Sequence, residues 1–253
     1  MKAFLKKEWM ENVRSGRLLL LLLIFLLFGI MNPAFAKLTP WMMNVMSDSL
    51  EDAGFLVGEV TVDAMTSWAQ FYKNIPMTLL IFVLLNSGTF TVEYQKETLI
   101  PVVTRGLSRS RILAAKTVML AGLWTVGYFL CYGTTLGYNW YFWDNRIAAH
   151  CGLGAVYYWL FGLWVISWMI FFSTVCQSSI QVLAGTGAVV FGVYLLGMVP
   201  KLHFWLPSEL MNGLKLLQGL SEPKDYGFCL IVTGITAAAA LLLSRICFER
   251  RTL

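Results

Sequence analysis

Long apolar runs, separated by shorter polar stretches, are the main feature of this sequence. A helix needs about 20 mostly apolar residues to cross a hydrocarbon core of about 30 Å. Lipid has no groups that can form hydrogen bonds with an exposed backbone. Each such run is therefore predicted to be an α-helix, which satisfies its own backbone groups. The pattern therefore predicts one all-α integral membrane domain over residues 1–253 with six transmembrane helices. The predicted spans are about 18–36, 75–92, 112–136, 153–175, 180–199 and 226–246.

The first run also has the outline of a secretory signal peptide, because a basic lead-in precedes it and Ala34-Phe35-Ala36 closes it. We interpret it instead as a retained first span. The run reaches about 19 residues, and its lead-in is amphipathic and carries Glu8 and Glu11 as well as lysines.

Composition strengthens the membrane interpretation. Only 13% of the residues are charged and 58% are hydrophobic, whereas soluble domains carry about 25% charged residues. The net charge of +5 does not indicate a nucleic-acid partner, because the basic residues flank the apolar runs. The lipid bilayer is the expected surrounding.

The distribution of charge predicts the topology. With six spans both termini lie on one side, and 13 of the 19 Lys and Arg residues fall on that side. The positive-inside rule therefore predicts that both termini are cytoplasmic.

Segments outside the spans are predicted to lie along the membrane surface. Residues 1–17 form an amphipathic pattern, with Phe4, Leu5, Trp9 and Val13 on one side, which suits a helix on the cytoplasmic leaflet. We favour anchoring of the chain to the membrane as the role of this helix. Docking of a partner is the more specific alternative.

The predicted outside loops also contain helical patterns. In the acidic loop 37–74 we expect short amphipathic helices on the outer surface, with an apolar stripe at Val62, Met65, Trp68 and Tyr72. In the last outside loop, leucines recur at helical spacing and predict a surface or re-entrant helix over 206–217.

Motifs for chemistry on this chain are missing from the sequence. It has no G-x-x-x-x-G-K-[ST] loop for phosphates, no H-E-x-x-H zinc motif and no recognisable nucleophile elbow. The two histidines, His150 and His203, have no nearby ligand set, and the five cysteines are scattered. We therefore expect no catalytic residue, no metal site and no cofactor on this chain.

The centres of the spans are free of ionisable residues, which disfavours an ion-coupled carrier. Asn86 and Ser87 are the most polar central pair. They are candidates for a substrate path, although helix–helix hydrogen bonding is the favoured role. A single G-x-x-x-G, from Gly133 to Gly137, is a weak indication of close helix packing.

The substantial inside loop, residues 93–111, carries the most informative pattern. Glu93 marks the membrane exit, and Ser108 is a helix N-cap before the third span. Between them lie an apolar patch and basic residues. The residues that we select as candidates for contact with a partner are Glu93, Thr98, Leu99, Ile100, Val102, Val103, Arg105, Arg109 and Lys116.

In this region the sequence resembles the type-2 ABC exporter permeases. In that family an acid ends the second span, a Gly-Thr-Leu-like step and a coupling helix follow, and a Pro-Val-Ser-Arg-like stretch leads to aliphatic residues and Gly-Lys. Glu93, Thr98-Leu99, Leu107-Ser108-Arg109, Ile112-Leu113 and Lys116 match this order. Glu97, Gly106 and Ala115 stand where the family has glycine, proline and glycine.

The resemblance implies a permease subunit without its own ATPase. Two permease chains, identical or different, would pair and dock two ATP-binding cassette subunits through loop 93–111. ATP and Mg²⁺ would be bound by those partner subunits. The location that it implies is a bacterial cytoplasmic membrane, and the aromatic loops and charge-free spans favour an amphipathic or hydrophobic substrate. A secondary carrier or channel, and a membrane-anchored sensor or scaffold, remain the alternatives.

Overall fold

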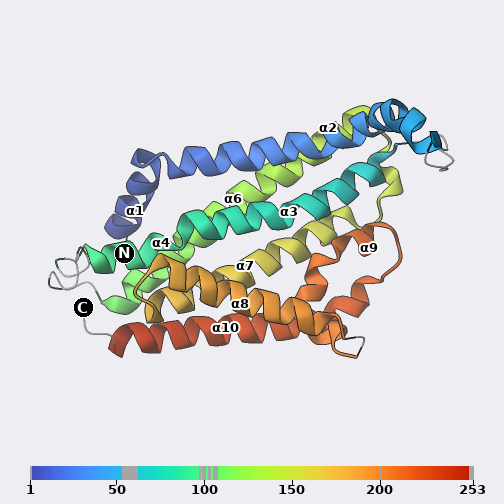
Figure 1. The fold of residues 1–253 in the computed structure, drawn as a ribbon. Coiled ribbons are helices and arrows are strands. Elements are labelled where there is room, and N and C mark those ends of the chain that lie inside the picture. The colour runs from blue at the N-terminus through green and yellow to red at the C-terminus, as the bar shows by residue number, and fades with distance from the viewer. Residues whose placement is uncertain are drawn as a thin grey trace.

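Helices account for the regular structure of the computed structural model (Figure 1). It describes residues 2–52, 62–96, 98, 101, 104, 108–199 and 201–250, without the side chains of residues 2, 3 and 46–52, and this part contains no strand. The α-helices are α1 (Lys2–Arg14), α2 (Arg17–Asp52), α3 (Ala64–Asn86), α4 (Gly88–Gln95), α6 (Arg109–Phe142), α7 (Cys151–Val175), α8 (Ser179–Gly197), α9 (Gly213–Leu217) and α10 (Gly227–Arg250). Short 3₁₀ turns are η1 (Asn145–Ile147), η2 (His203–Trp205), η3 (Pro207–Met211) and η4 (Pro223–Tyr226).

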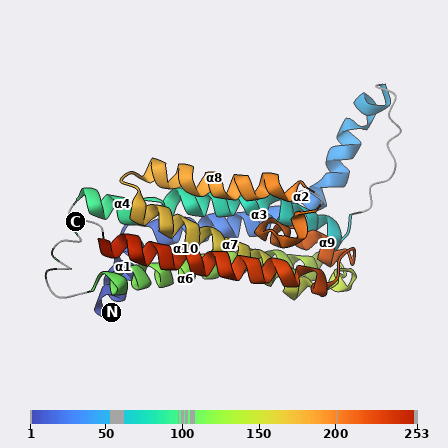
Figure 2. The ribbon, with the colours of Figure 1, turned by 90° about the horizontal axis from the view of Figure 1, so that it is seen from below.

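Six helical segments are long and apolar enough to cross a membrane, as the sequence predicts. They are Arg17–Val45, Ala64–Gln95, Arg109–Phe142, Cys151–Val175, Ser179–Gly197 and Pro223–Arg250. These segments run along the bundle, and both chain termini lie at the same end, which we call the terminal end (Figures 1 and 2). The opposite end is the distal end. The fold therefore indicates a multi-pass membrane protein, and the side on which the termini lie stays a prediction.

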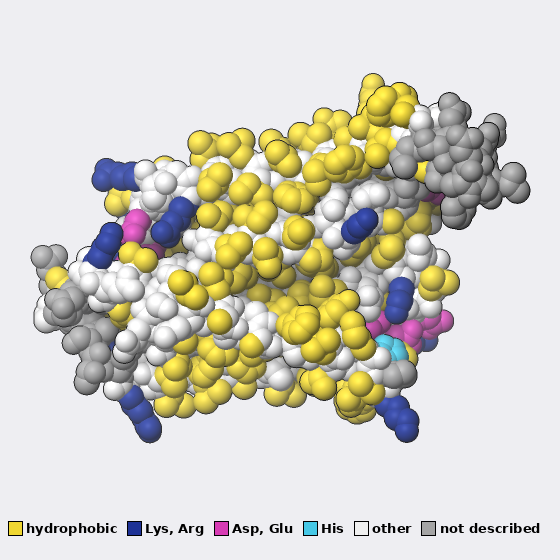
Figure 3. All heavy atoms as spheres, in the orientation of Figure 1, with side chains coloured by type: hydrophobic (Ala, Val, Ile, Leu, Met, Phe, Trp, Pro, Cys, Tyr) yellow, Lys and Arg dark blue, Asp and Glu magenta, His cyan; other side chains and the backbone are white. Residues whose placement is uncertain are grey.

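The surface pattern agrees with this placement. Hydrophobic side chains cover much of the surface along the bundle, whereas Lys and Arg side chains lie mostly toward its two ends (Figure 3). Among the spans, α7 is the most buried and α8 the most exposed to the surroundings. An apolar outer surface is what a bundle in lipid requires, because the hydrocarbon there solvates apolar side chains.

The first and second spans are longer than predicted. Helix α2 continues without interruption to Asp52, and α3 already begins at Ala64, so the prediction of separate short helices in 37–52 and 64–74 is wrong. The expected stripe on α3 faces inward: Trp68 is fully buried and its indole donates a 2.8 Å hydrogen bond to Asn145 Oδ1. Residues 53–61 lie outside the described part.

Helix α2 passes through Pro33 because a neighbouring helix satisfies the backbone there. Proline has no N–H, so the carbonyl of Gly29 loses its partner within the helix. The Thr135 hydroxyl of α6 donates to that carbonyl over 3.0 Å and accepts from Asn32 Nδ2 over 3.3 Å. Asn74 of α3 donates to Asn32 Oδ1 over 3.0 Å, so the group joins three spans.

Replacing Thr135 by valine is expected to destabilise the bundle by about 1–3 kcal/mol, because the Gly29 carbonyl and the Asn32 amide would be buried without this partner. Thermal unfolding of the purified chain in detergent measures the loss. Thr117→Val is the matched control, since that hydroxyl donates to Leu113 of its own helix. Equal losses in the two variants would contradict the interhelical role.

Helix α1 turns back across the terminal end of the bundle, and Gly16, with a φ of 72°, makes the turn into α2. The predicted apolar face of α1 is divided. Phe4 and Glu8 are buried against the bundle, whereas Trp9 and Val13 are about half exposed on the outer side. The bundle selects the buried face of α1, and that face includes an acid. The contact of α1 with the cytoplasmic leaflet stays a prediction.

The predicted helix over 206–217 is also interrupted. It consists of η3 and α9, separated at Asn212, and it packs on α7 at the distal end instead of lying on the surface. Leu210, Leu216 and Leu217 are buried in this contact. The leucine spacing therefore wrongly indicated one continuous helix.

Candidate functional site: a buried charge cluster at the terminal end

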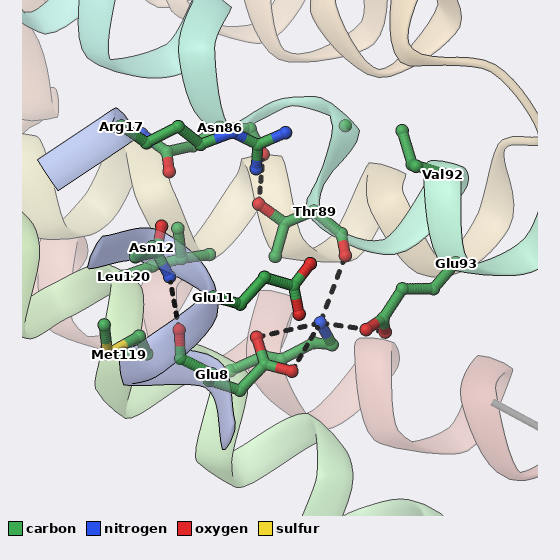
Figure 4. Close-up of a pocket in the computed structure, with 12 residues that line it drawn as sticks. Glu8, Glu11, Asn12, Arg17, Asn86, Thr89, Val92, Glu93, Met119 and Leu120 are labelled. Atoms are coloured by element: carbon green, nitrogen blue, oxygen red, sulfur yellow. Dashed lines mark hydrogen bonds and ion pairs between the residues drawn. The ribbon is translucent and has the colours of Figure 1, made fainter. Parts of the chain in front are cut away.

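Lys116 of α6 is the centre of a group of charged side chains inside the terminal end of the bundle. Its side chain is 1% exposed. The Nζ atom lies 3.1 Å from Glu8 Oε2 of α1 and 2.9 Å from Glu93 Oε2 of α4. It also donates a 3.1 Å hydrogen bond to the carbonyl oxygen of Thr89 (Figure 4). One ammonium group therefore ties together α1, α4 and α6.

A second lysine, Lys7 of α1, completes what we call the charge cluster: Lys7, Glu8, Glu93 and Lys116. Lys7 Nζ lies 2.8 Å from Glu93 Oε1 and 3.3 Å from Glu8 Oε1. Burial alone lowers the pKa of the Lys7 ammonium, but the hydrogen bond to Glu93 and the negative charges of Glu93, Glu8 and Glu11 together raise this pKa above its ordinary value. Two carboxylates and two ammonium groups thus balance within the cluster.

The break between α3 and α4 shapes the site. Helix α3 ends at Asn86, and side chains at this point donate to backbone carbonyls of α3: Asn86 Nδ2 to Phe82 over 2.8 Å and Ser87 Oγ to Leu84 over 3.0 Å. Thr89 Oγ1 donates to the Asn86 carbonyl over 2.6 Å. This break leaves the backbone carbonyl of Thr89 within reach of Lys116.

Asn86 and Ser87, the predicted path residues, are 2% and 3% exposed and donate to their own helix. Asn86 also lines a cavity of about 40 Å³ beside the charge cluster, together with Glu11 and Arg17. A cavity of that size holds a few water molecules. It is therefore too small for the amphipathic substrate that the sequence suggests.

Glu8, Glu11 and Glu93 are the described residues whose spacing could suit a metal ion, since their ligand atoms lie within 4.8 Å of one another. Lys116 and Lys7 contact the same carboxylates over 2.8–3.3 Å. Because each carboxylate is already paired with at least one of these ammonium groups, the arrangement fits an internal ion-pair network better than a divalent cation.

The charge cluster lies where the predicted partner loop joins helices α4 and α6, which we call the root of the loop. Glu93 is near the end of α4, before the loop, and Lys116 is in the second turn of α6, after it. Arg109 fastens the same root to α10, because its guanidinium donates to the Phe248 and Glu249 carbonyls over 3.3 and 3.1 Å. Thr98 donates its backbone N–H to the Glu93 carbonyl over 3.1 Å.

The structure thus brings Glu93, Thr98, Arg109 and Lys116 together at one end of the bundle, though in roles that differ from the sequence interpretation. Glu93 and Lys116 are buried and face α1, so their side chains do not form a docking surface. The apolar patch and the remaining arginine of the prediction lie outside the described residues; they are Leu99, Ile100, Val102, Val103 and Arg105.

Sequence reasoning missed Lys7 and Glu8 as members of this site. A signal for Glu8 exists, since it lies one helical turn after Phe4 and therefore shares its face. An acid on an otherwise apolar face indicates a buried partner of opposite charge. The sequence does not show that this partner is Lys116, because Glu8 and Lys116 are 108 residues apart and meet only in the tertiary structure.

Neither the protein-family models nor the curated proteins that were compared contain a match to this chain. The class that fold and site define is a helical multi-pass membrane protein with a buried charge cluster at its terminal end. A more specific identity is a matter of proposal.

Proposed function

We propose that this chain is the membrane-spanning permease subunit of an ABC exporter of the type-2 family. It would move an amphipathic or hydrophobic substrate, such as a drug, an antimicrobial peptide or a lipid-like molecule, out of a bacterial cell. A separate subunit would bind ATP and Mg²⁺ and hydrolyse the nucleotide. A second permease chain, identical or different, would complete the pathway.

The observation that carries this proposal is the way in which the two ends of the loop between α4 and α6 are attached to the bundle. A loop that receives force from a partner must be fixed to the spans that it moves. Here the loop follows Glu93 and precedes Arg109, whose side chains reach α1 and α10. Both residues also belong to the sequence pattern that resembles the family.

The proposal assigns different tasks to the loop and its root. The loop residues Leu99–Val103 and Arg105 would contact the ATPase, whereas the charge cluster would hold the root rigid. A rigid root transmits displacement better than a flexible one, because packed elements shift as units. The substrate path past Asn86 and Ser87 would then open in the paired chains.

Reversing the charge of the loop arginines tests the docking step. The double variant Arg105→Glu with Arg109→Glu is expected to lose at least about tenfold in affinity for the proposed ATP-binding cassette subunit. Co-purification after co-expression in membranes measures the loss. Arg105→Glu alone separates docking from the structural contacts that Arg109 makes with α10.

A double reversal at Lys215 and Lys224, two exposed lysines at the distal end, is the matched control. It should leave co-purification unchanged. Full transport by the chain without any ATPase would reject the proposal. Transport that stops when the proton gradient collapses, while ATP persists, would favour the secondary carrier instead. Ligand binding without any ATP-dependent flux would favour the sensor or scaffold.

A further inference from the structure

A groove runs between α2 and α6 near the distal end, far from the charge cluster. Its volume is about 480 Å³, and Pro33, Ala34, Lys37, Tyr138 and Phe142 are among its lining residues. The Tyr138 and Phe142 rings are stacked, with centroids 6.0 Å apart, and form one wall. The opposite wall is the apolar face of α2.

The groove opens on the surface that faces lipid. Ile30 and Leu38, which line it on α2, are 40% and 46% exposed, so no other described part of the chain covers this face. Trp140 and Tyr141, directly before the end of α6, are 73% and 81% exposed. Exposed aromatic residues mark the level at which acyl chains meet headgroups.

One positive charge stands at the mouth of the groove. Lys37 Nζ lies 3.9 Å from the centroid of the Phe142 ring, which holds the ammonium group beside the groove. Within the described part of the chain no acid forms an ion pair with Lys37. Apolar walls with one fixed cation at headgroup level complement a molecule that has an apolar tail and an anionic head.

We propose that this groove binds an anionic phospholipid, with an acyl chain along Pro33, Ala34 and Tyr138 and the phosphate against Lys37. The proposal depends on the membrane location of the six spans and stands apart from the transport proposal. A bound lipid would fill the space between α2 and α6 just beyond the Thr135 contact that joins them.

Lipid retention in native mass spectrometry tests the site. The full chain is purified from nanodiscs that contain phosphatidylglycerol or phosphatidylcholine, and the bound lipid is counted. Lys37→Gln is expected to weaken phosphatidylglycerol retention about fivefold, because one cation near the surface is removed. Retention of phosphatidylcholine should change little.

Two further variants make the outcome decisive. Lys73→Gln changes an exposed lysine of α3 outside the groove and should leave retention unchanged. Ala34→Phe fills the groove and should reduce retention of both lipids. Melting curves confirm that each variant is folded.

The proposal is overturned if Lys37→Gln and Lys73→Gln retain phosphatidylglycerol equally, or if the wild-type chain retains both lipids equally. It is also overturned if Ala34→Phe alters the oligomeric state and leaves lipid retention intact. That result would show that a second copy of the chain occupies the groove.

Discussion

Replacing Lys116 by methionine is expected to destabilise the chain by about 3–5 kcal/mol. Methionine fills a similar volume but supplies no charge, so Glu8 and Glu93 remain buried with Lys7 as the remaining cation that contacts them. The Thr89 carbonyl also loses its donor. Because Lys116 joins α1 to α4 and α6, we expect α1 to detach first.

Thermal unfolding in detergent measures the loss, and limited proteolysis within residues 1–17 reports the release of α1. Lys224→Met is the matched control, since that side chain is 91% exposed and lies 3.9 Å from Glu222. Removing such a surface pair costs less than about 1 kcal/mol.

A rescue experiment separates charge from packing. In the background of Lys116→Met, changing Glu8 and Glu93 to glutamine removes the uncompensated carboxylates and should restore part of the stability. If Lys116→Met melts like Lys224→Met, the charge cluster does not hold α1 in place.

Replacing Gly162 by alanine is expected to destabilise the bundle by about 3 kcal/mol, at the upper end of what overpacking costs. A Cβ atom at Gly162 of α7 would lie 2.2 Å from the Trp124 ring of α6. Trp124 cannot retreat easily, because it is fully buried and its indole donates a 3.1 Å hydrogen bond to the Trp159 carbonyl.

Gly133→Ala is the control for this variant. A Cβ atom there would meet nothing within 4 Å, so alanine should be neutral or stabilise the helix by about 1 kcal/mol through its higher helix propensity. Melting temperatures of the two variants in the same detergent make the comparison. Equal behaviour would show that α6 and α7 do not meet at Gly162.

These two glycines show how far pattern reasoning reaches. The G-x-x-x-G motif at Gly133 and Gly137 suggested close packing, yet both positions are open within this chain. Gly162, which belongs to no motif, is one of the positions where two spans come into close contact. Small residues permit close approach, but the sequence does not say which neighbour takes the space.

Pro33 gives a similar lesson. It lies near the predicted end of the first span at about residue 36, and proline normally interrupts a helix. Helix α2 continues past it since Thr135, over 100 residues away in sequence, satisfies the free carbonyl. A local rule failed because a tertiary hydrogen bond supplied the missing partner.

The sequence by itself determined the six apolar helices and their even number. The hydrocarbon core accepts only long apolar segments with internally satisfied backbones, which leaves a clear local pattern. It also placed Glu93, Arg109 and Lys116 at the ends of a single loop.

Only the tertiary structure decided which charges meet. Glu93 and Lys116 turn inward because Glu8 and Lys7 of α1 balance them, and a charge enters a protein interior only with such partners. It also divided the apolar face of α1, extended α2 past Pro33 and created the groove at Lys37. Each of these depends on side chains that are distant in sequence and adjacent in space, so no local pattern encodes it.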